Sequence, residues 1–211
     1  MNFIPHVDRQ AASYGAAEFL AAGLKARLAG ETSATLIVSG GSTPGECFAA
    51  LSAMPLDWGR VSVMPTDERR VPAEHEASNE RMIRQQLLQN LAQEATYISL
   101  LDSKLAVQDL SVTCALVGMG EDGHFASIFP DCANLQPLLD MNAAPQCVQV
   151  ETAASEHGRV SANLSLLLSG DSVALLIFGE HKKKILFNPD GLPIASLLQQ
   201  KQTPVQVYWA P

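Results

Sequence analysis

A carboxylate and an imidazole stand together in one glycine-rich segment, Gly118-Met119-Gly120-Glu121-Asp122-Gly123-His124. Its glycines let the backbone adopt positive φ angles and come close to a ligand, while Asp122 and His124 bring their side chains to the same turn. These residue types suit proton-transfer chemistry. The simpler alternative is a tight turn between a strand and a helix, in which His124 only caps a neighbouring group.

The apolar run at residues 114–117 directly precedes this segment and has the length and composition of a buried strand. We therefore place His124 on the loop that follows the strand. The glycine spacing also matches a dinucleotide-binding fingerprint. Two acidic residues between the glycines would bring negative charge against a pyrophosphate, so we regard nucleotide binding as the weaker interpretation.

A second segment has the features of a phosphate site. Residues 34–38 predict a strand, Ser39-Gly40-Gly41-Ser42-Thr43-Pro44 follows it, and residues 46–54 predict a helix. Free amides at the start of a helix, its positive dipole end and nearby hydroxyls together suit a phosphate. The Gly-Lys-Ser/Thr of a nucleotide P-loop is absent, so no nucleoside triphosphate is implied. An ordinary strand-to-helix turn explains the segment equally well when it is taken alone.

Charged residues follow two further predicted strands. Residues 66–72, Thr-Asp-Glu-Arg-Arg-Val-Pro, come after a strand at 60–65, and the basic segment 179–184 follows another strand. The simpler explanations are a solvated loop for residues 66–72 and a solvated helix start for Lys182-Lys183-Lys184. However, Asp67 lies close to the end of its strand, and Lys182 is the lysine nearest the preceding strand, where it could bind a phosphate as a point charge.

Alternation of strands and helices along the whole chain predicts an α/β fold with a mostly parallel sheet and helices on both faces. Further helices are expected at residues 8–29, 78–91 and 165–169, and further strands at 97–101, 147–152, 173–178 and 205–209. Ligands bind such sheets at the carboxyl ends of the strands. We therefore expect the four polar segments to form one site, within a single domain over residues 1–211.

Composition narrows the classes of partner. A net charge of −8 and a pI near 5.0 argue against a nucleic-acid or anionic-membrane surface. The four cysteines lack metal-ligand spacing and predict reduced, structural thiols in a cytoplasmic protein. The N-terminal residues lack signal-peptide features, and no apolar run approaches about 18 residues, so we expect neither secretion nor a membrane span.

The predicted site contains a phosphate cradle, a histidine, an aspartate and several cations. A Gly-x-Ser-x-Gly nucleophile motif is absent, and His75 and His181 do not complete a metal constellation with His124. We expect no metal and no cofactor. The remaining chemistry is general base catalysis on a phosphorylated small molecule.

These motifs resemble the 6-phosphogluconolactonase family over nearly the whole chain. The resemblance rests on residues 39–44, 66–72 and 118–130, on Ser78-Asn79, and on the weaker Arg159-Val160-Ser161 and Gly179-x-x-Lys182. It implies a Rossmann-like fold shared with glucosamine-6-phosphate deaminases and ribose-5-phosphate isomerases. It also implies metal-independent hydrolysis of 6-phospho-D-glucono-1,5-lactone to 6-phospho-D-gluconate in the oxidative pentose phosphate pathway. For the oligomeric state, both a monomer and a homodimer are compatible with the sequence.

By the same analogy, His124 would deprotonate the water that attacks the lactone carbonyl and would return the proton to the ring oxygen. Asp67 would orient the histidine, the water or a sugar hydroxyl. The phosphate and hydroxyls would be held by Gly40, Gly41, Ser42, Thr43, Arg69, Arg159 and Lys182.

The chain departs from the family pattern at Thr113, where an Asp is expected, and at Phe125 and Ile128, which replace Thr and Leu. Two alternatives remain. Glucosamine-6-phosphate deaminases share the Asp-Gly-His turn but continue with Phe-Asn-Glu-Pro, whose Asn-Glu pair is missing here. The effector domains of some bacterial regulators, which sense sugar phosphates, resemble this fold. Such a sensor would not need His124, and the sequence shows no DNA-binding helix pair or basic arm.

Overall fold

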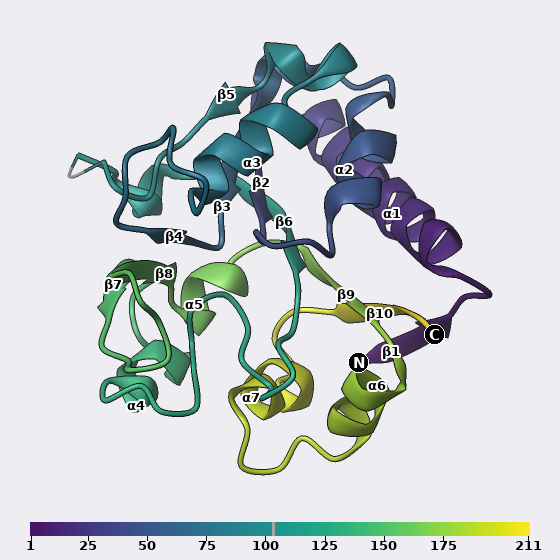
Figure 1. Ribbon diagram of the computed structural model, residues 1–211. Coiled ribbons are helices and arrows are strands. Elements are labelled where there is room, and N and C mark those ends of the chain that lie inside the picture. Colours follow the sequence, from purple (N-terminus) through teal and green to yellow (C-terminus); the bar gives the residue numbers. More distant parts are fainter. Residues whose placement is uncertain (103) are drawn as a thin grey trace.

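A parallel sheet of seven strands forms the centre of the computed structural model, which describes residues 1–102 and 104–211 (Figure 1). The strand order is β1-β10-β9-β6-β2-β3-β5. Their bounds are β1 (Asn2–Pro5), β2 (Ala34–Val38), β3 (Val61–Pro65), β5 (Thr96–Tyr97), β6 (Val112–Val117), β9 (Ser172–Phe178) and β10 (Val205–Ala210). All neighbouring pairs are parallel, which confirms the predicted architecture.

Helices cover both faces of this sheet (Figure 1). The α-helices are α1 (Arg9–Gly30), α2 (Gly45–Ser52), α3 (Asn79–Gln86), α4 (Leu135–Leu139), α5 (Leu164–Leu167), α6 (Glu180–Phe187) and α7 (Pro193–Gln199). Short 3-10 turns occur at Trp58–Arg60, Asn90–Glu94 and Val107–Asp109. Among the described residues, no helix is both long and apolar enough to span a bilayer.

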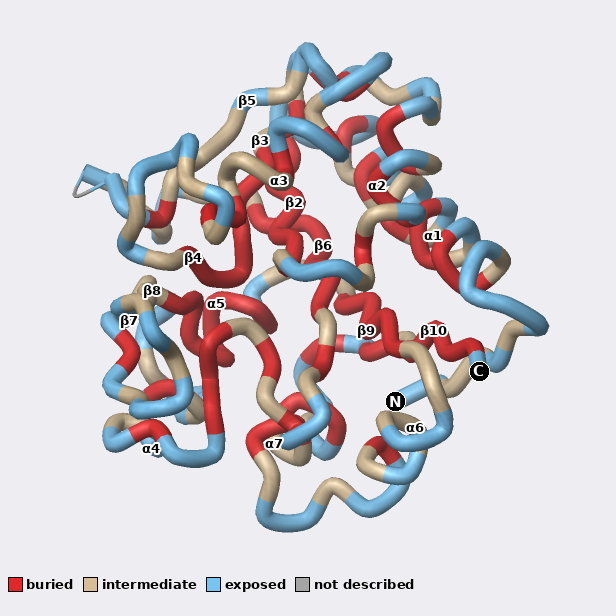
Figure 2. The backbone as a smooth tube through the Cα atoms, in the orientation of Figure 1, coloured by how far each residue is buried: buried red, intermediate tan, exposed pale blue. Residues whose placement is uncertain are grey.

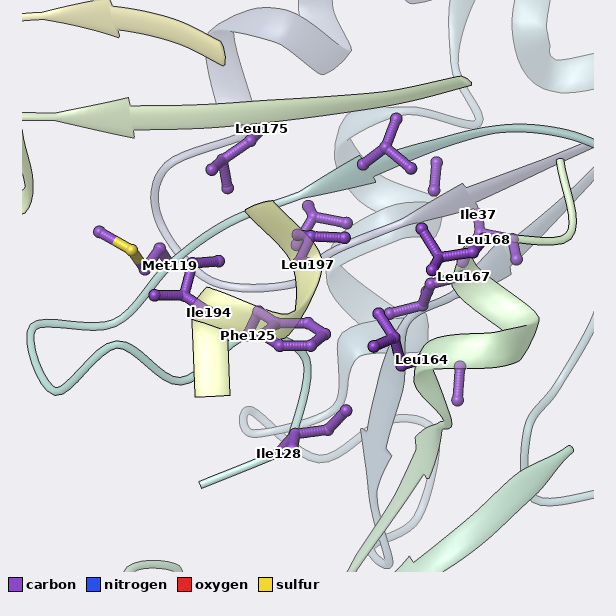
Figure 3. Close-up of a cluster of buried hydrophobic side chains, with 14 of the residues drawn as sticks. Ile37, Met119, Phe125, Ile128, Leu164, Leu167, Leu168, Leu175, Ile194 and Leu197 are labelled. Carbon is purple, nitrogen blue, oxygen red and sulfur yellow. The ribbon is translucent and has the colours of Figure 1, made fainter. Parts of the chain in front are cut away.

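The central strands are buried on both faces (Figure 2), so successive side chains belong to two separate apolar cores. Leu36 packs in the core under α1, α2 and α3, and the next residue, Ile37, packs in the core on the opposite face, under α5 and α7. Phe125 and Ile128, from the segment after β6, belong to the second core (Figure 3). The loop that carries His124 is therefore anchored by buried side chains.

A second, antiparallel sheet has the order β4-β8-β7, from β4 (Asp67–Arg69), β8 (Arg159–Ala162) and β7 (Cys147–Val150). Thr66 joins the two sheets, because its amide donates to Val38 O at 2.8 Å and its carbonyl accepts from the Ala162 amide at 2.8 Å. The expectation of a solvated loop at residues 66–72 is therefore wrong for β4. Asp67 and Glu68 are buried in this pairing with the distant β8, whereas Arg69 is half-buried.

Some other elements differ from the sequence predictions in their bounds, and some were not predicted. Strand β1 was not expected, β5 is shorter than the predicted 97–101, and α3 ends before residue 91. Helix α6 begins at Glu180, so Lys182 lies in the first turn of a helix. Helix α7, which begins with a proline, was also missed.

Truncation of Phe125 tests the anchoring of the histidine loop. Its ring is fully buried, so Phe125→Ala should reduce the free energy of unfolding by about 3–5 kcal/mol. Phe187→Ala is the matched control, since that ring is 53% exposed and loses chiefly an edge-to-face contact with Phe3, worth about 1 kcal/mol. Urea unfolding of both variants measures the difference. Equal costs would contradict the anchoring.

Candidate active site

A polar cavity of about 350 Å³ opens at the carboxyl ends of β2, β3 and β6. In parallel α/β sheets this edge is the usual ligand site. The cavity is lined by residues 39–43, Asp67, Arg69, Asn79, residues 118–120 and 124–126, Phe129, Ala154 and Arg159. Three of the four polar segments expected to converge therefore meet here, and the segment 179–184 does not.

His124 and Asp122 form a hydrogen-bonded pair at this cavity. His124 Nδ1 lies 2.6 Å from Asp122 Oδ1, and the amide N of His124 lies 3.2 Å from the same oxygen. An ionised carboxylate only accepts, so Nδ1 carries the hydrogen in this contact. In the neutral ring the other nitrogen, Nε2, is then an acceptor, as a general base requires, and no donor among the described residues bonds to it.

Asp122 is held in its ionised form by His124. Partial burial raises the pKa of the Asp122 carboxyl, but the amide, the ring and the charge of His124 outweigh it and hold the pKa below its usual value. The carboxylate is thus available to orient the ring over the ordinary pH range.

The glycines of this loop are required for close packing. A Cβ on Gly120 would lie 2.2 Å from His124 Nδ1 and 2.7 Å from Asp122 Oδ1. Gly123 has a φ of +75°, and a Cβ there would lie 2.9 Å from Leu192 Cβ. The spacing that resembles a dinucleotide fingerprint therefore accommodates the His-Asp pair and the approach of α7.

Asp67 also lines the cavity and is 5% exposed. Its carboxylate accepts from Thr66 Oγ1 at 2.9 Å, from Ser127 Oγ, and from Arg159 Nη1 at 3.3 Å. The carboxylate that contacts His124 thus belongs to Asp122, and not to Asp67 as one of the expected roles required. Asp67 instead joins β4 to the histidine loop and to β8.

Arg159 is fixed by several contacts. Its Nη1 donates to Ser127 Oγ at 3.2 Å and its Nε to Ser155 Oγ at 2.6 Å. Burial lowers the pKa of Arg159, and the neighbouring Asp67 carboxylate opposes that effect. The guanidinium also lies 5.4 Å from the centroid of the Phe129 ring.

Phe129 forms an apolar wall between the histidine and the arginine. Its ring centroid lies 4.4 Å from that of His124, and the residue is 7% exposed. Its role was not predicted from the sequence, although Phe129 lies within residues 118–130, which carry the family resemblance. Asn79 was likewise missed, although Ser78-Asn79 was already part of the family resemblance.

Residues Gly40 to Thr43 also line the cavity, before α2 begins. Gly41 has a φ of +87°, and a Cβ on Gly40 would lie 2.0 Å from Asn79 Oδ1. Arg69 is close by, since its Nη1 lies 3.3 Å from the same Asn79 oxygen. The predicted cradle therefore shares one cavity with Arg69 and Arg159.

Lys182 does not line the cavity. It is half-buried, and that burial lowers the pKa of its ammonium group while Glu121 raises it. Within residues 1–102 and 104–211, no group of three or more His, Cys, Asp or Glu side chains is arranged to hold a metal ion.

Known proteins and a family model match this chain over nearly its whole length. A family model described as glucosamine-6-phosphate isomerases/6-phosphogluconolactonase matches residues 7–209. The 6-phosphogluconolactonase of Mesorhizobium japonicum is 34% identical, with 100% of this chain and 95% of that protein covered. A crystal structure of a 6-phosphogluconolactonase from Shewanella baltica superposes with a TM-score of 0.92 at 33% identity, covering 100% and 98% of the two chains. A monomeric glucosamine-6-phosphate deaminase shares the fold, with a TM-score of 0.76 at 16% identity over 98% and 97% of the chains.

The pairing of Asp122 with His124 can be tested by titration. We expect the Asp122 carboxyl to titrate below the ordinary value of about 3.9, and its pKa to rise in His124→Ala, which removes the ring and keeps the amide. The contact therefore stabilises the fold fully above about pH 4 and is lost as pH falls through the lowered pKa. Carbon-13 NMR of the side-chain carboxyl measures both values. An identical pKa in the two proteins would contradict the pairing.

Proposed function

The chain belongs to the glucosamine-6-phosphate isomerase/6-phosphogluconolactonase family, and we propose that it is a lactonase that converts 6-phospho-D-glucono-1,5-lactone to 6-phospho-D-gluconate. One observation carries this proposal: the His124–Asp122 pair opens into the same cavity as the Gly40–Thr43 cradle and two arginines. The reaction places a general base at one end of its substrate and a phosphate at the other.

His124 acts first as a base. With Nδ1–H donated to Asp122, Nε2 accepts a proton from a water whose oxygen attacks the C1 carbonyl of the lactone. The resulting tetrahedral intermediate collapses with cleavage of the bond between C1 and the ring oxygen. The imidazolium returns its proton to that oxygen, which leaves the open-chain acid and regenerates neutral His124.

Asp67 acts through its position. Three donors already occupy its carboxylate, and an ionised carboxylate has about four acceptor sites. We assign the remaining site to a sugar hydroxyl or to the water. The contact with Arg159 keeps that guanidinium at the cavity wall, where it binds the hydroxyl end of the substrate.

The phosphate is assigned to the amides of Gly40 and Gly41, the hydroxyls of Ser42 and Thr43, and the guanidinium of Arg69. Lys182, outside the cavity lining, contributes a second positive charge at longer range. All four cysteines are free thiols, which supports a cytoplasmic location.

Replacement of His124 tests the chemistry. The lactone also opens spontaneously, so the signal is the excess rate over a protein-free blank. We expect His124→Ala to lose about 10²- to 10⁴-fold of this excess, the usual contribution of a general base. Generating the lactone from glucose 6-phosphate and following product through a coupled dehydrogenase gives the rate. His181→Ala is the control, because His181 is exposed and lies outside the cavity lining. A His124→Ala protein as fast as wild type would refute the mechanism.

Arg69 tests the phosphate assignment. We expect the wild type to prefer the phosphorylated lactone over glucono-1,5-lactone, and Arg69→Ala to reduce this preference in kcat/KM by about 10- to 150-fold, the value of one charge-assisted contact. Arg70→Ala is the matched control, since Arg70 donates to Gln149 and does not line the cavity. Equal losses on both lactones would show that Arg69 binds something other than the phosphate.

A further inference from the structure

Glu68 is a buried carboxylate that the proposed chemistry does not use. It is 3% exposed and does not line the cavity. Oε1 accepts from the amides of Arg69 at 2.7 Å and Asn79 at 2.8 Å, and Oε2 accepts from the Glu80 amide at 2.7 Å and from Ser78 Oγ at 3.3 Å. Among the described residues, no salt bridge includes it. Its charge is balanced by backbone dipoles, two of which belong to the first turn of α3.

These contacts hold the start of α3 against β4 and thereby place the side chain of Asn79. Asn79 Nδ2 donates to Asp67 O at 2.7 Å, and Asn79 Oδ1 accepts from Arg69 Nη1 at 3.3 Å. The same oxygen lies 2.0 Å from where a Cβ on Gly40 would stand. Asn79 is therefore wedged between the cradle peptide and β4.

The guanidinium of Arg69 depends on the same segment. Arg69 Nη1 donates to Ala77 O at 2.5 Å in addition to Asn79 Oδ1. Both acceptors lie within three residues of each other, next to the amides that Glu68 binds. A shift of residues 77–80 would consequently move the guanidinium of Arg69 and also Asn79, which lies against Gly40.

We propose that Glu68 is a positioning residue for the phosphate subsite: its carboxylate fastens residues 78–80 to β4 and so fixes Asn79 and Arg69 against Gly40. The inference rests on the proposed function, because it takes the cradle and Arg69 as the place of the phosphate. It adds a residue that touches no substrate yet determines how tightly the phosphorylated substrate binds.

The chemistry of the contacts requires a carboxylate. All four groups that face Glu68 are donors, and a carboxylate offers only acceptors. In Glu68→Gln the side chain keeps its size, but its NH₂ group must face at least one amide N–H. That donor is left unsatisfied in a buried place, so the segment moves to relieve it.

The test compares Glu68→Gln with Glu80→Gln, the same chemical change in the first turn of α3. The Glu80 side chain pairs with Arg84 at 2.8 Å, away from the cavity, and its amide to Glu68 is retained. For Glu68→Gln we expect KM for the phosphorylated lactone to rise at least about tenfold, while kcat/KM for glucono-1,5-lactone stays within about twofold. Glu80→Gln should match the wild type on both substrates.

Calorimetric titration with 6-phosphogluconate gives a second readout that does not need turnover. The dissociation constant should rise with KM in Glu68→Gln only. If that variant does not fold, Asn79→Ala replaces it, because it removes the wedge and keeps the backbone amide that Glu68 binds; the same selective loss is expected.

Three results would overturn the inference: a folded Glu68→Gln protein with wild-type KM, equal losses on both lactones, or a neutral Asn79→Ala. Failure of the proposed function looks different, since the wild type itself would then not exceed the spontaneous rate. In that case the dissociation constants for 6-phosphogluconate decide the positioning role alone.

Discussion

The parallel hydrogen bonding of β2 to β3 and β6 is the constraint on which the site depends. Parallel strands put all their carboxyl ends on one edge, so the segments that follow them must meet there. The same pairing buries the strands on both faces and requires helices to return the chain on each side. The cavity thus lies where the chain leaves the hydrogen-bonded sheet. Residues at these strand ends are held in place by the sheet.

In and next to the cavity, three acidic residues each have a defined set of donors. Asp122 is paired with His124, Asp67 with Arg159 and two hydroxyls, and Glu68 with backbone amides and Ser78. Asp67 pairs with Arg159, but among the described residues no carboxylate forms a salt bridge with Arg69, so the charge of Arg69 stays available to an anionic ligand. A protein of net charge −8 can in this way present an arginine to a phosphate.

The sequence was most informative where structure is determined locally. Residues 34–38 form the predicted strand because an apolar run bounded by turn residues has few alternatives, and the glycine-rich segments lie where their strands end. It was least informative where burial comes from distant partners. Asp67 and Glu68 have the sequence features of loop residues, and their strand forms only through pairing with β8. The role of Phe129 depends on Arg159, which is distant in sequence and lies over its ring in the fold. Lys182 was predicted as a phosphate ligand, but it lies in the first turn of α6 and outside the cavity lining.

The division of the interior into two cores has a consequence for how such a site evolves. Phe129, next to His124, packs in the core on one face of the sheet. Helix α2, which follows the cradle, and α3, which begins with Asn79, pack in the core on the other face. Substitutions in one core can therefore retune the catalytic half of the site without disturbing the half that grips the substrate. Such modularity gives one scaffold a route to new reactions on the same class of metabolite, because recognition is inherited while chemistry diversifies.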